Sequence, residues 1–499
     1  MKLLFLGHDY KYAVEQMLLA LFPDERPEYV TASGEASDDF ALVSFETGED
    51  AARAFCRMTF GGKSAEGEYS VPSGGYSDAL SKERAYQKAV RFAFFNAAEK
   101  ITGSIPPWGA LTGIRPARIA SRRLGSGMSE GDAFRVLTDE YFVSKDRAEL
   151  CMDAAKASVR AMSLISPRDI SLYVGIPFCP TRCAYCSFVS SSVEKSFSLI
   201  EPYLGALFAE IRSGAELVRS LGLNISTVYI GGGTPTTLTA KQLDALLFEL
   251  ENNFDLSHLL EYTVEAGRPD TMDDEKIAVL KAHGVTRVSV NPQTMDDSVL
   301  EAIGRRHTSG DVLRAMDIAR RGGMEHINMD VIAGLPTDSV SGFRKTMERV
   351  VSMGADNITV HTLSLKKGSR ILLDGLAIPS AEDVTQMLSC AAELLPRNGF
   401  SPYYIYRQKY MSGSFENVGW CRENCECLYN IYIMEELQSI LSLGAGGSTK
   451  MVDVKSGYIV RAFNLKYPAE YIARPEKIAA NQKAFADFHD ERMRSAKSV

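Results

Sequence analysis

Three closely spaced cysteines are the residues of this chain best suited to inorganic chemistry. Cys179, Cys183 and Cys186 follow one another as C-x₃-C-x₂-C. Cysteine thiolates are the usual ligands of iron–sulfur clusters, and three of them leave one iron of a four-iron cube open to another ligand. A zinc knuckle or three unrelated thiols are the alternatives, although structural zinc usually takes four protein ligands and no fourth Cys or His follows closely. The spacing therefore favours a [4Fe–4S] cluster.

A second group of cysteines lies far along the chain. Cys421, Cys425 and Cys427 have the spacing C-x₃-C-x-C. This group could ligate a metal ion or another iron–sulfur centre, but the single-residue gap is awkward for one cube, and unpaired thiols on a loop are the alternative. The remaining cysteines are most simply small core residues: Cys56, Cys151 and Cys390.

Length and composition limit the classes of protein to which the chain can belong. A chain of 499 residues, 45% of them hydrophobic, predicts two or three globular domains. The net charge of −8 argues against a general nucleic-acid surface, so an acidic substrate would need a local basic pocket. Nine cysteines in so long a chain do not indicate a disulfide framework.

The chain also carries no membrane signal. The apolar run Leu3–Leu6 is too short for a signal peptide, and no stretch approaches ~20 uninterrupted apolar residues. An oxygen-sensitive cluster needs a reducing compartment. We therefore expect a cytoplasmic protein without a membrane span and without a nucleic-acid partner.

Residues 1–165 are predicted to form an N-terminal α+β domain. Alternation and helical spacing of apolar residues predict strands at Lys2–Leu6 and Ala41–Phe45 and helices at Tyr10–Phe22 and Glu83–Ile101. A loop with turn-forming residues follows at 106–118 and carries Arg115 and Arg118. This loop is either an ordinary connection or part of a substrate site.

From residue 166 to 370 short apolar runs alternate with helical patterns. The predicted strands are Ser171–Ile176, Ser226–Ile230, Glu261–Glu265, Arg287–Val290, Asn328–Ile332 and Ile358–Leu363. The helices between them include Tyr203–Leu221, Lys241–Asn252 and Asp311–Gly322. Repeated βα units predict an α/β fold, a partial (β/α)₆ TIM-like barrel with its site at the carboxyl ends of the strands. Residues 371–499 are expected to form a small α+β region with a helix at Ala381–Leu395 and a strand at Tyr403–Tyr406.

Polar and glycine-rich motifs sit on or just after these predicted strands. Gly231, Gly232 and Gly233 end the second strand, and glycines let a ligand approach the backbone closely. Glu265 ends the third strand, and the remaining candidates are Gln293 and Asp330. Their placement agrees with the barrel rule.

Taken together, these motifs resemble a known family. The run Leu172–Phe178 before the cysteines, the motif Gly231–Thr236 and the N-terminal segment Leu111–Pro116 are similar to those of the oxygen-independent coproporphyrinogen III dehydrogenases. This family belongs to the radical S-adenosylmethionine (SAM) superfamily, and the N-terminal segment resembles that of its HemZ-like branch. The resemblance implies a [4Fe–4S] cluster and SAM as cofactors.

The resemblance also implies roles for individual residues. The cluster ligands would be Cys179, Cys183 and Cys186. The residues that contact SAM would be Tyr173, Tyr185, Gly232, Gly233, Thr234, Glu265, Gln293, Arg305 and Asp330. Of these, Tyr173 lies beside the cluster and Arg305 neutralises the SAM carboxylate, so we assign both to the catalytic centre. Tyr185 packs near the adenine, and Gln293 holds the ribose.

The implied reaction is the oxidative decarboxylation of two propionates of coproporphyrinogen III to vinyl groups, which gives protoporphyrinogen IX. It needs a low-potential electron donor and an electron acceptor. The four carboxylates of the porphyrinogen would require arginines, because their planar forks suit carboxylates. The candidates are Arg115, Arg118, Arg306 and Arg407.

Two positions depart from the dehydrogenase pattern. Gly175 stands where those enzymes carry a histidine, and Ser187 and Phe188 stand where they carry a fourth cysteine. A related heme-chaperone branch carries a histidine–asparagine pair, of which this chain has only the asparagine at Asn417. A heme-binding chaperone and another porphyrin-directed radical enzyme are therefore the alternatives.

Overall fold

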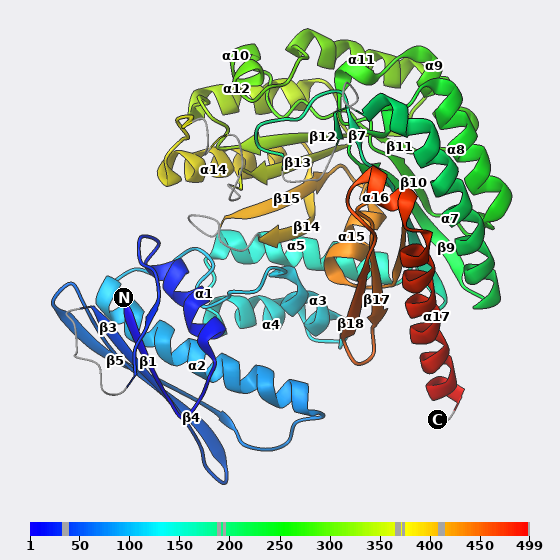
Figure 1. The fold of residues 1–499 in the computed structure, drawn as a ribbon. Coiled ribbons are helices and arrows are strands. Elements are labelled where there is room, and N and C mark those ends of the chain that lie inside the picture. The colour runs from blue at the N-terminus through cyan, green and yellow to red at the C-terminus, as the bar shows by residue number, and fades with distance from the viewer. Residues whose placement is uncertain are drawn as a thin grey trace. The chain divides into compact units, whose positions relative to one another are not determined.

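The computed structural model of the chain describes residues 1–31, 39–186, 191–192, 196–364, 371, 375–407 and 415–497 (Figure 1). The chain divides into two units rather than three. The first unit consists of Met1–Met152 and Arg407–Phe415, and the second consists of Asp153–Tyr406 and Glu416–Val499.

The first unit is built on a five-stranded sheet with the strand order β2-β1-β3-β4-β5. Its strands are β1 (Lys2–Leu6), β2 (Glu28–Tyr29), β3 (Phe40–Thr47), β4 (Ala51–Phe60) and β5 (Lys63–Pro72). β1 pairs in parallel with β2 and β3, whereas β3, β4 and β5 form an antiparallel meander. Alternate residues of β3 and β4 are buried, as expected of strands with one covered face. The predicted strands Lys2–Leu6 and Ala41–Phe45 are confirmed.

Two helices cover this sheet: α1 (Lys11–Leu21) and α2 (Ala79–Thr102), both predicted from their apolar spacing. α2 packs closely on β5 at Gly67, where an added Cβ would lie 2.3 Å from the carbonyl oxygen of Ala93. The other elements of this region are α3 (Ala117–Gly125), α4 (Glu130–Arg135), the π-turn η1 (Val136–Glu140) and α5 (Lys145–Met162), the last of which continues into the second unit.

The second unit contains the predicted partial barrel. Its parallel strands are β6 (Asp169–Ile176), β9 (Asn224–Gly232), β10 (Glu261–Val264), β11 (Arg287–Ser289), β12 (His326–Ala333) and β13 (Asn357–Thr362). They lie side by side in this order, and every neighbouring pair is parallel. All six predicted strands and the α/β barrel class are confirmed.

Helices connect these strands. They are α7 (Ile200–Ser220), α8 (Ala240–Asn253), α9 (Asp274–Ala282), α10 (Asp297–Ala302), α11 (Ser309–Arg321) and α12 (Val340–Ser352), with the 3₁₀ turns η2 (Phe197–Leu199), η3 (Pro235–Thr237) and η4 (Pro269–Thr271). A further helix, α14 (Ala381–Arg397), follows β13. Capping boxes from Thr239, Thr308 and Ser380 begin α8, α11 and α14, because each hydroxyl accepts from an otherwise unpaired backbone N–H.

Residues 371–499 do not form a separate domain. Their elements are β14 (Ser401–Arg407), β15 (Glu416–Cys421), α15 (Leu428–Glu435), β16 (Ile440–Leu443), β17 (Ser448–Asp453), β18 (Tyr458–Phe463), α16 (Pro468–Ala473) and α17 (Pro475–Lys497). β15 pairs antiparallel with β13, and β16 pairs in parallel with β6. The predicted boundary at 370 differs from the structure because an open parallel sheet leaves two unpaired edges, and this region covers both of them.

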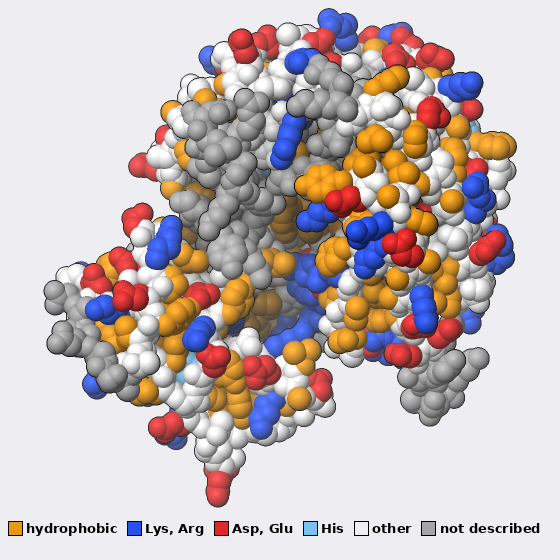
Figure 2. Space-filling view, viewed as in Figure 1, with side chains coloured by type: hydrophobic (Ala, Val, Ile, Leu, Met, Phe, Trp, Pro, Cys, Tyr) orange, Lys and Arg blue, Asp and Glu red, His pale blue; other side chains and the backbone are white. Residues whose placement is uncertain are grey.

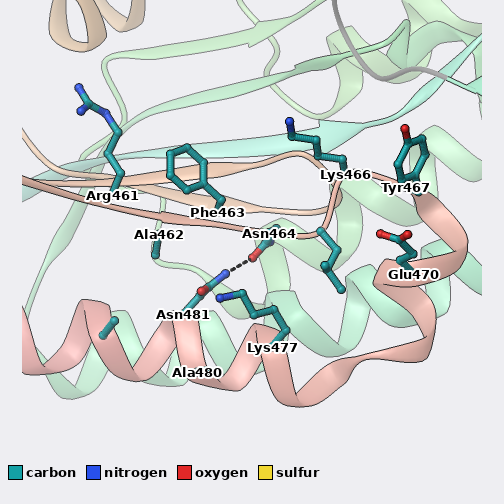
Figure 3. A pocket seen from close by; sticks show the side chains of 12 residues that line it. Arg461, Ala462, Phe463, Asn464, Lys466, Tyr467, Glu470, Lys477, Ala480 and Asn481 are labelled. Carbon is teal, nitrogen blue, oxygen red and sulfur yellow. Dashed lines mark hydrogen bonds between the residues drawn. The ribbon is translucent and has the colours of Figure 1, made fainter.

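A buried carboxylate attaches the C-terminal elements to the barrel. Glu210 of α7 is 3% exposed and accepts hydrogen bonds from Gly444 N (2.6 Å), Asn464 Nδ2 (2.9 Å) and the Tyr471 hydroxyl. Asn481 of α17 donates in turn to Asn464 (2.7 Å), beside a cavity of about 650 Å³ (Figure 3). One side chain thus joins α7, the β16–β17 turn and α16.

The surface is mixed in charge. Figure 2 shows acidic and basic side chains interspersed over the face that it draws. Among the described residues no helix combines the length and the apolar content needed to cross a bilayer.

Removing the Glu210 carboxylate should destabilise the protein strongly. In Glu210→Ala three buried donors lose their acceptor, which costs about 1–3 kcal/mol for each donor. We expect the melting temperature of the full chain in scanning calorimetry to fall by several degrees. Glu216→Ala, at an exposed position of the same helix, is the matched control. Equal melting temperatures for the two variants would contradict this account of the network.

Candidate functional site

Cys179, Cys183 and Cys186 lie immediately beyond the carboxyl end of β6. Cys179 ends the short strand β7 (Phe178–Cys179), which pairs with β8 (Ser191–Ser192). Cys183 and Cys186 follow in a turn closed by the bond from Cys186 N to Cys183 O (3.2 Å). All three cysteines are partly exposed. The structure therefore places them where the barrel rule expects a site.

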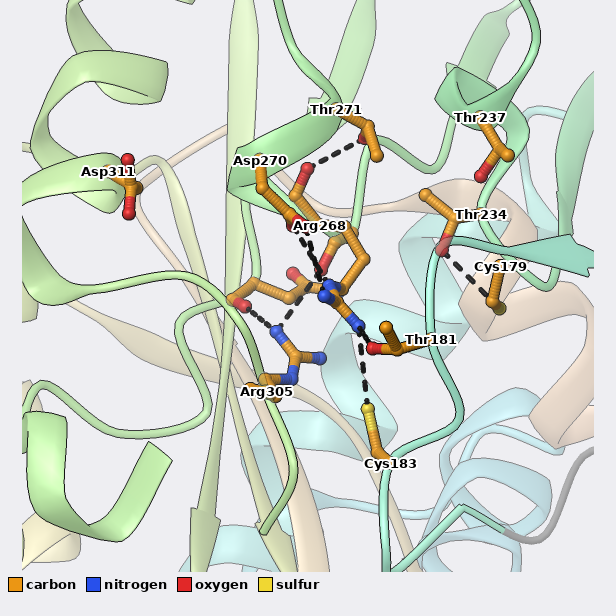
Figure 4. Close-up of polar contacts among 12 residues, drawn as sticks. Cys179, Thr181, Cys183, Thr234, Thr237, Arg268, Asp270, Thr271, Arg305 and Asp311 are labelled. Carbon is orange, nitrogen blue, oxygen red and sulfur yellow. Dashed lines mark hydrogen bonds and ion pairs between the residues drawn. The ribbon is translucent and has the colours of Figure 1, made fainter. Parts of the chain in front are cut away.

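Thr234 and Arg268 each donate a hydrogen bond to one of these sulfur atoms (Figure 4). Thr234 Oγ1 lies 3.6 Å from Cys179 Sγ, and Arg268 Nη1 lies 3.8 Å from Cys183 Sγ. Arg268 is 3% exposed and is held by both carboxylate oxygens of Asp270, at 2.9 and 3.0 Å. Hydrogen-bond donors and a nearby positive charge stabilise thiolates. The donor set thus fits a cluster held by thiolate ligands.

The glycine turn at the end of β9 packs against the strand that leads to the cysteines. Gly233 N and Thr234 N donate to the carbonyl oxygens of Ile176 and Phe178, both at 2.7 Å. A Cβ on Gly233 would lie 2.5 Å from Phe178 O, and Gly232 has φ +110°, so glycine is required at both positions.

This packing limits which backbone groups of the turn can contact a ligand. The N–H groups of Gly233 and Thr234 are used within the protein, and that of Gly232 donates to the Glu265 carboxylate. Of the two kinds of backbone group, only carbonyl oxygens are left to receive a ligand. Such oxygens suit an amino group, which is a donor.

Two carboxylates lie inside the barrel near the same turn. Burial raises the pKa of Glu265, just beyond β10, to about 7, although the Tyr229 hydroxyl donates to it. Burial also opposes ionisation of Asp330 on β12, but contacts from His361 and Asn328 outweigh it and lower the pKa of Asp330. The two carboxylates therefore differ in their readiness to lose a proton.

Gln293 has an unusual backbone and an unpaired side-chain atom. Its φ is +67°, a conformation that residues other than glycine rarely adopt. Its backbone donates to Asp330 O (2.9 Å) and accepts from Ile332 N (3.0 Å). Its buried Oε1 has no hydrogen-bond partner among the described residues. Backbone strain combined with an unpaired buried acceptor is typical of a ligand-binding position.

Arg305 links the cysteine turn to the loop after β11. It is 8% exposed and donates to the Tyr185 hydroxyl (3.2 Å) and to Asn291 O (2.7 Å). Tyr185 precedes Cys186 and packs against an apolar cluster that contains Ile303. The structure thus brings the sequence-predicted residues into one connected region, from the cysteines through Arg305 and Asn291 to Asp330.

Other residues of this region were not singled out from the sequence. Arg268 and His361 lie after and within predicted strands, so the rule that selected Glu265 could have selected them. Tyr429 stacks on Tyr229 with 4.4 Å between the ring centroids, and the Tyr173 ring lies 6.3 Å from that of Tyr229. The sequence gives no signal for this stacking, because Tyr429 comes from α15, far along the chain.

The structure explains one departure from the family pattern, at Gly175, and gives the surroundings of Asn417. A Cβ on Gly175 would lie 2.8 Å from Ala445 O, so the backbone occupies the space that a histidine would need. Asn417 is fully buried, and its Oδ1 accepts from Thr362 N (2.8 Å), which gives it a structural contact. Ser187 and Phe188 lie outside the described residues.

The candidate substrate arginines differ in their surroundings. Arg407 is buried, donates to Leu111 O and lies 5.1 Å over the Trp108 ring, so its guanidinium has a structural role. Arg115 and Arg118 are half-buried, and Arg306 is exposed.

The second cysteine group lies at the opposite end of the barrel. Cys427 Sγ donates to Glu261 (3.2 Å), the first residue of β10, whereas Cys179 follows the end of β6. Cys421 is buried on β15. In the described part of the chain, Cys425 is the one member of this group that lies in a cluster of three potential metal-binding side chains.

Comparisons with known proteins agree with this architecture. The model of the radical SAM superfamily matches residues 173–350. The oxygen-independent coproporphyrinogen-III oxidase-like protein HemZ of Bacillus subtilis is 36% identical over 409 residues, which cover 80% of this chain and 82% of that protein. The heme chaperone HemW of Mycobacterium tuberculosis is 30% identical over 312 residues, which cover 61% and 74% of the two chains.

A solved structure shares the fold. Coproporphyrinogen III oxidase (HemN) of Escherichia coli, described as a radical SAM enzyme, superposes with a TM-score of 0.52 and 22% identity over 65% of this chain and 72% of that chain. The motif at Cys179–Cys186, the barrel and the extent of the match to HemZ lead to one conclusion. The chain belongs to the radical SAM superfamily and, within it, to the HemZ-like family of oxygen-independent coproporphyrinogen-III oxidase-like proteins.

Proposed function

We propose that the protein is an oxygen-independent coproporphyrinogen III dehydrogenase, which converts two propionates of coproporphyrinogen III to vinyl groups. In each of them the side chain –CH₂–CH₂–COO⁻ becomes –CH=CH₂, with loss of CO₂, one hydrogen atom and one electron. When bound, the cluster and SAM supply a 5′-deoxyadenosyl radical that accepts the hydrogen atom. An external low-potential donor and an acceptor complete the electron balance.

The residues of this chain would divide the work between the two cofactors. Cys179, Cys183 and Cys186 would hold the cluster as thiolates, with Arg268 and Thr234 donating to two of the sulfur atoms. The carbonyl oxygens of the Gly232–Thr234 turn would accept from the SAM amino group.

Other side chains would hold the rest of SAM. The unpaired Oε1 of Gln293 would accept from a ribose hydroxyl. Arg305 would face the SAM carboxylate while it holds Tyr185, and Tyr173 would lie beside the cluster. Glu265 and Asp330, close to each other inside the barrel, complete the set.

One observation carries the choice of reaction. The second unit makes up about two thirds of the chain, so the match to HemZ over 80% must extend into the first unit. The match to the M. tuberculosis heme chaperone covers 61% and needs only the second unit. The HemZ name carries the words coproporphyrinogen-III oxidase-like, and this supports the dehydrogenase.

A heme chaperone is the second candidate. Several relatives carry that name at 30 to 32% identity. The two functions share a porphyrin ligand and differ in chemistry, because the dehydrogenase makes vinyl groups and a chaperone transfers intact heme.

Product analysis distinguishes the two. The protein, reconstituted anaerobically with iron and sulfide, should convert coproporphyrinogen III with SAM and reductant to the divinyl product, with two CO₂ and two 5′-deoxyadenosine per product. Cys183→Ala should abolish turnover, whereas Cys390→Ala, which changes a buried thiol, should retain it. Unchanged tetracarboxylate in mass spectra together with stoichiometric heme binding would establish the chaperone instead.

The ligand assignment predicts which cysteines the cluster needs. Alanine at Cys179, Cys183 or Cys186 should remove the EPR signal of the reduced cluster, and the intact protein should bind about four irons per chain at this site. Alanine at Cys421, Cys425 or Cys427 should leave that signal in place. A full cluster in Cys183→Ala would refute the assignment.

The raised pKa of Glu265 predicts how SAM binding depends on pH. The carboxylate, not the acid, attracts the SAM sulfonium, so binding releases a proton and affinity increases as the pH rises through about 7. Below that pH the affinity should fall about fivefold over the first unit and approach tenfold per unit at lower pH. Isothermal titration of the cluster-loaded protein with SAM at several pH values measures this affinity.

Two variants test whether the pH dependence of SAM binding comes from the charge of the Glu265 carboxylate. Glu265→Gln should abolish the pH dependence, whereas Gln293→Ala should weaken binding and keep the dependence. An unchanged pH profile in Glu265→Gln would show that this carboxyl does not contact SAM.

A further inference from the structure

Three side chains with different metal-binding atoms meet at the amino ends of β12 and β13. They are His326, the first residue of β12, Asp356, which precedes β13, and Cys425, from the segment between β15 and α15. One ligand atom of each lies within 4.8 Å of the other two. All three residues are partly exposed, so an ion could reach them.

Backbone contacts hold two of these residues side by side. Ile327 N, next to His326, donates to Asp356 Oδ2 (2.8 Å) and so orients the carboxylate toward β12. Arg320 Nη2 donates to the same oxygen (2.9 Å). The side-chain contacts found for Asp356 among the described residues therefore all use Oδ2. Oriented carboxylates of this kind are common around metal ligands.

Hydrogen bonds also fix the backbone of Cys425. The carbonyl oxygen of Cys425 accepts from Arg287 Nη2 (3.1 Å) and Asn357 Nδ2 (2.6 Å), and its N–H donates to Arg422 O (3.1 Å). Arg422 N donates to Asp356 O (2.9 Å), which ties the cysteine turn directly to the loop that carries the carboxylate.

The imidazole of His326 provides a second, independent observation. Nδ1 of His326 is buried and has no hydrogen-bond partner in the described part of the chain. A buried polar atom without a partner costs free energy unless an ion, a ligand or water satisfies it.

We propose that His326, Asp356 and Cys425 bind a divalent transition metal ion, with zinc as the best match. Imidazole nitrogen, carboxylate oxygen and thiolate sulfur are the three protein ligands that zinc takes, and water completes a tetrahedron. In such a tetrahedron the ligand atoms lie about 3.3 to 3.8 Å apart, so only small side-chain rotations are needed. The thiol loses its proton on binding, and the thiolate and carboxylate neutralise the ion.

The position of this site indicates a structural role. It lies at the end of the barrel opposite to Cys179, and it joins β12, the loop before β13 and the segment after β15. A bound ion would clamp the edge at which the C-terminal region joins the sheet. The proposal does not rest on the proposed reaction.

The test uses the full chain with the three cluster cysteines changed to alanine, so that iron and zinc cannot bind there. This protein, freed of metal with a chelator under anaerobic conditions, is titrated with Co²⁺. We expect one ion per chain, a thiolate-to-cobalt charge-transfer band in the near ultraviolet, and displacement by Zn²⁺.

Substitutions in the same background locate the ion. Cys425→Ser and His326→Gln should each weaken binding at least about tenfold, and Cys425→Ser should abolish the charge-transfer band. Cys427→Ser, whose thiol contacts Glu261 instead, should keep both. Circular dichroism confirms that each variant is folded. Absence of a bound ion, or loss of the band in Cys427→Ser but not in Cys425→Ser, would overturn the proposal.

Discussion

The close backbone contact between the glycine turn of β9 and the strand that leads to the cysteines is the constraint on which the site depends. With a Cβ on Gly233 only 2.5 Å from Phe178 O, this contact tolerates no side chain. It places Thr234 against Cys179 and Gly232 against Glu265, so one turn positions groups from both sets of residues that we propose for the cluster and for SAM. A shift here would move both sets together.

The open parallel sheet creates a second constraint. Six parallel strands gather polar residues at one end but leave two unpaired edges, and residues after 370 add β15 to one edge and β16 to the other. Glu210 then joins the β16 side to α7. The C-terminal region is therefore part of the barrel's framework and also supplies Tyr429 to its interior.

Local patterns in the sequence were sufficient for most of the architecture. The alternation of apolar runs and helical stretches located all six parallel strands, because each βα unit is a local feature. The cysteine spacing and the strand ends predicted a candidate site region from local features in the same way. Arg268 reaches Cys183 from 85 residues away, and β15 pairs across the chain with β13, so neither contact has a local signal. The boundary expected at 370 failed because edge pairing depends on tertiary structure.

Gln293 shows that the candidate site is not optimised for stability alone. Its left-handed backbone costs of order 1–3 kcal/mol, which glycine would avoid, and its Oε1 is buried without a partner. Glycine at this position would relieve the backbone cost but remove the buried acceptor, so stability and the proposed ligand contact make opposite demands on this one residue.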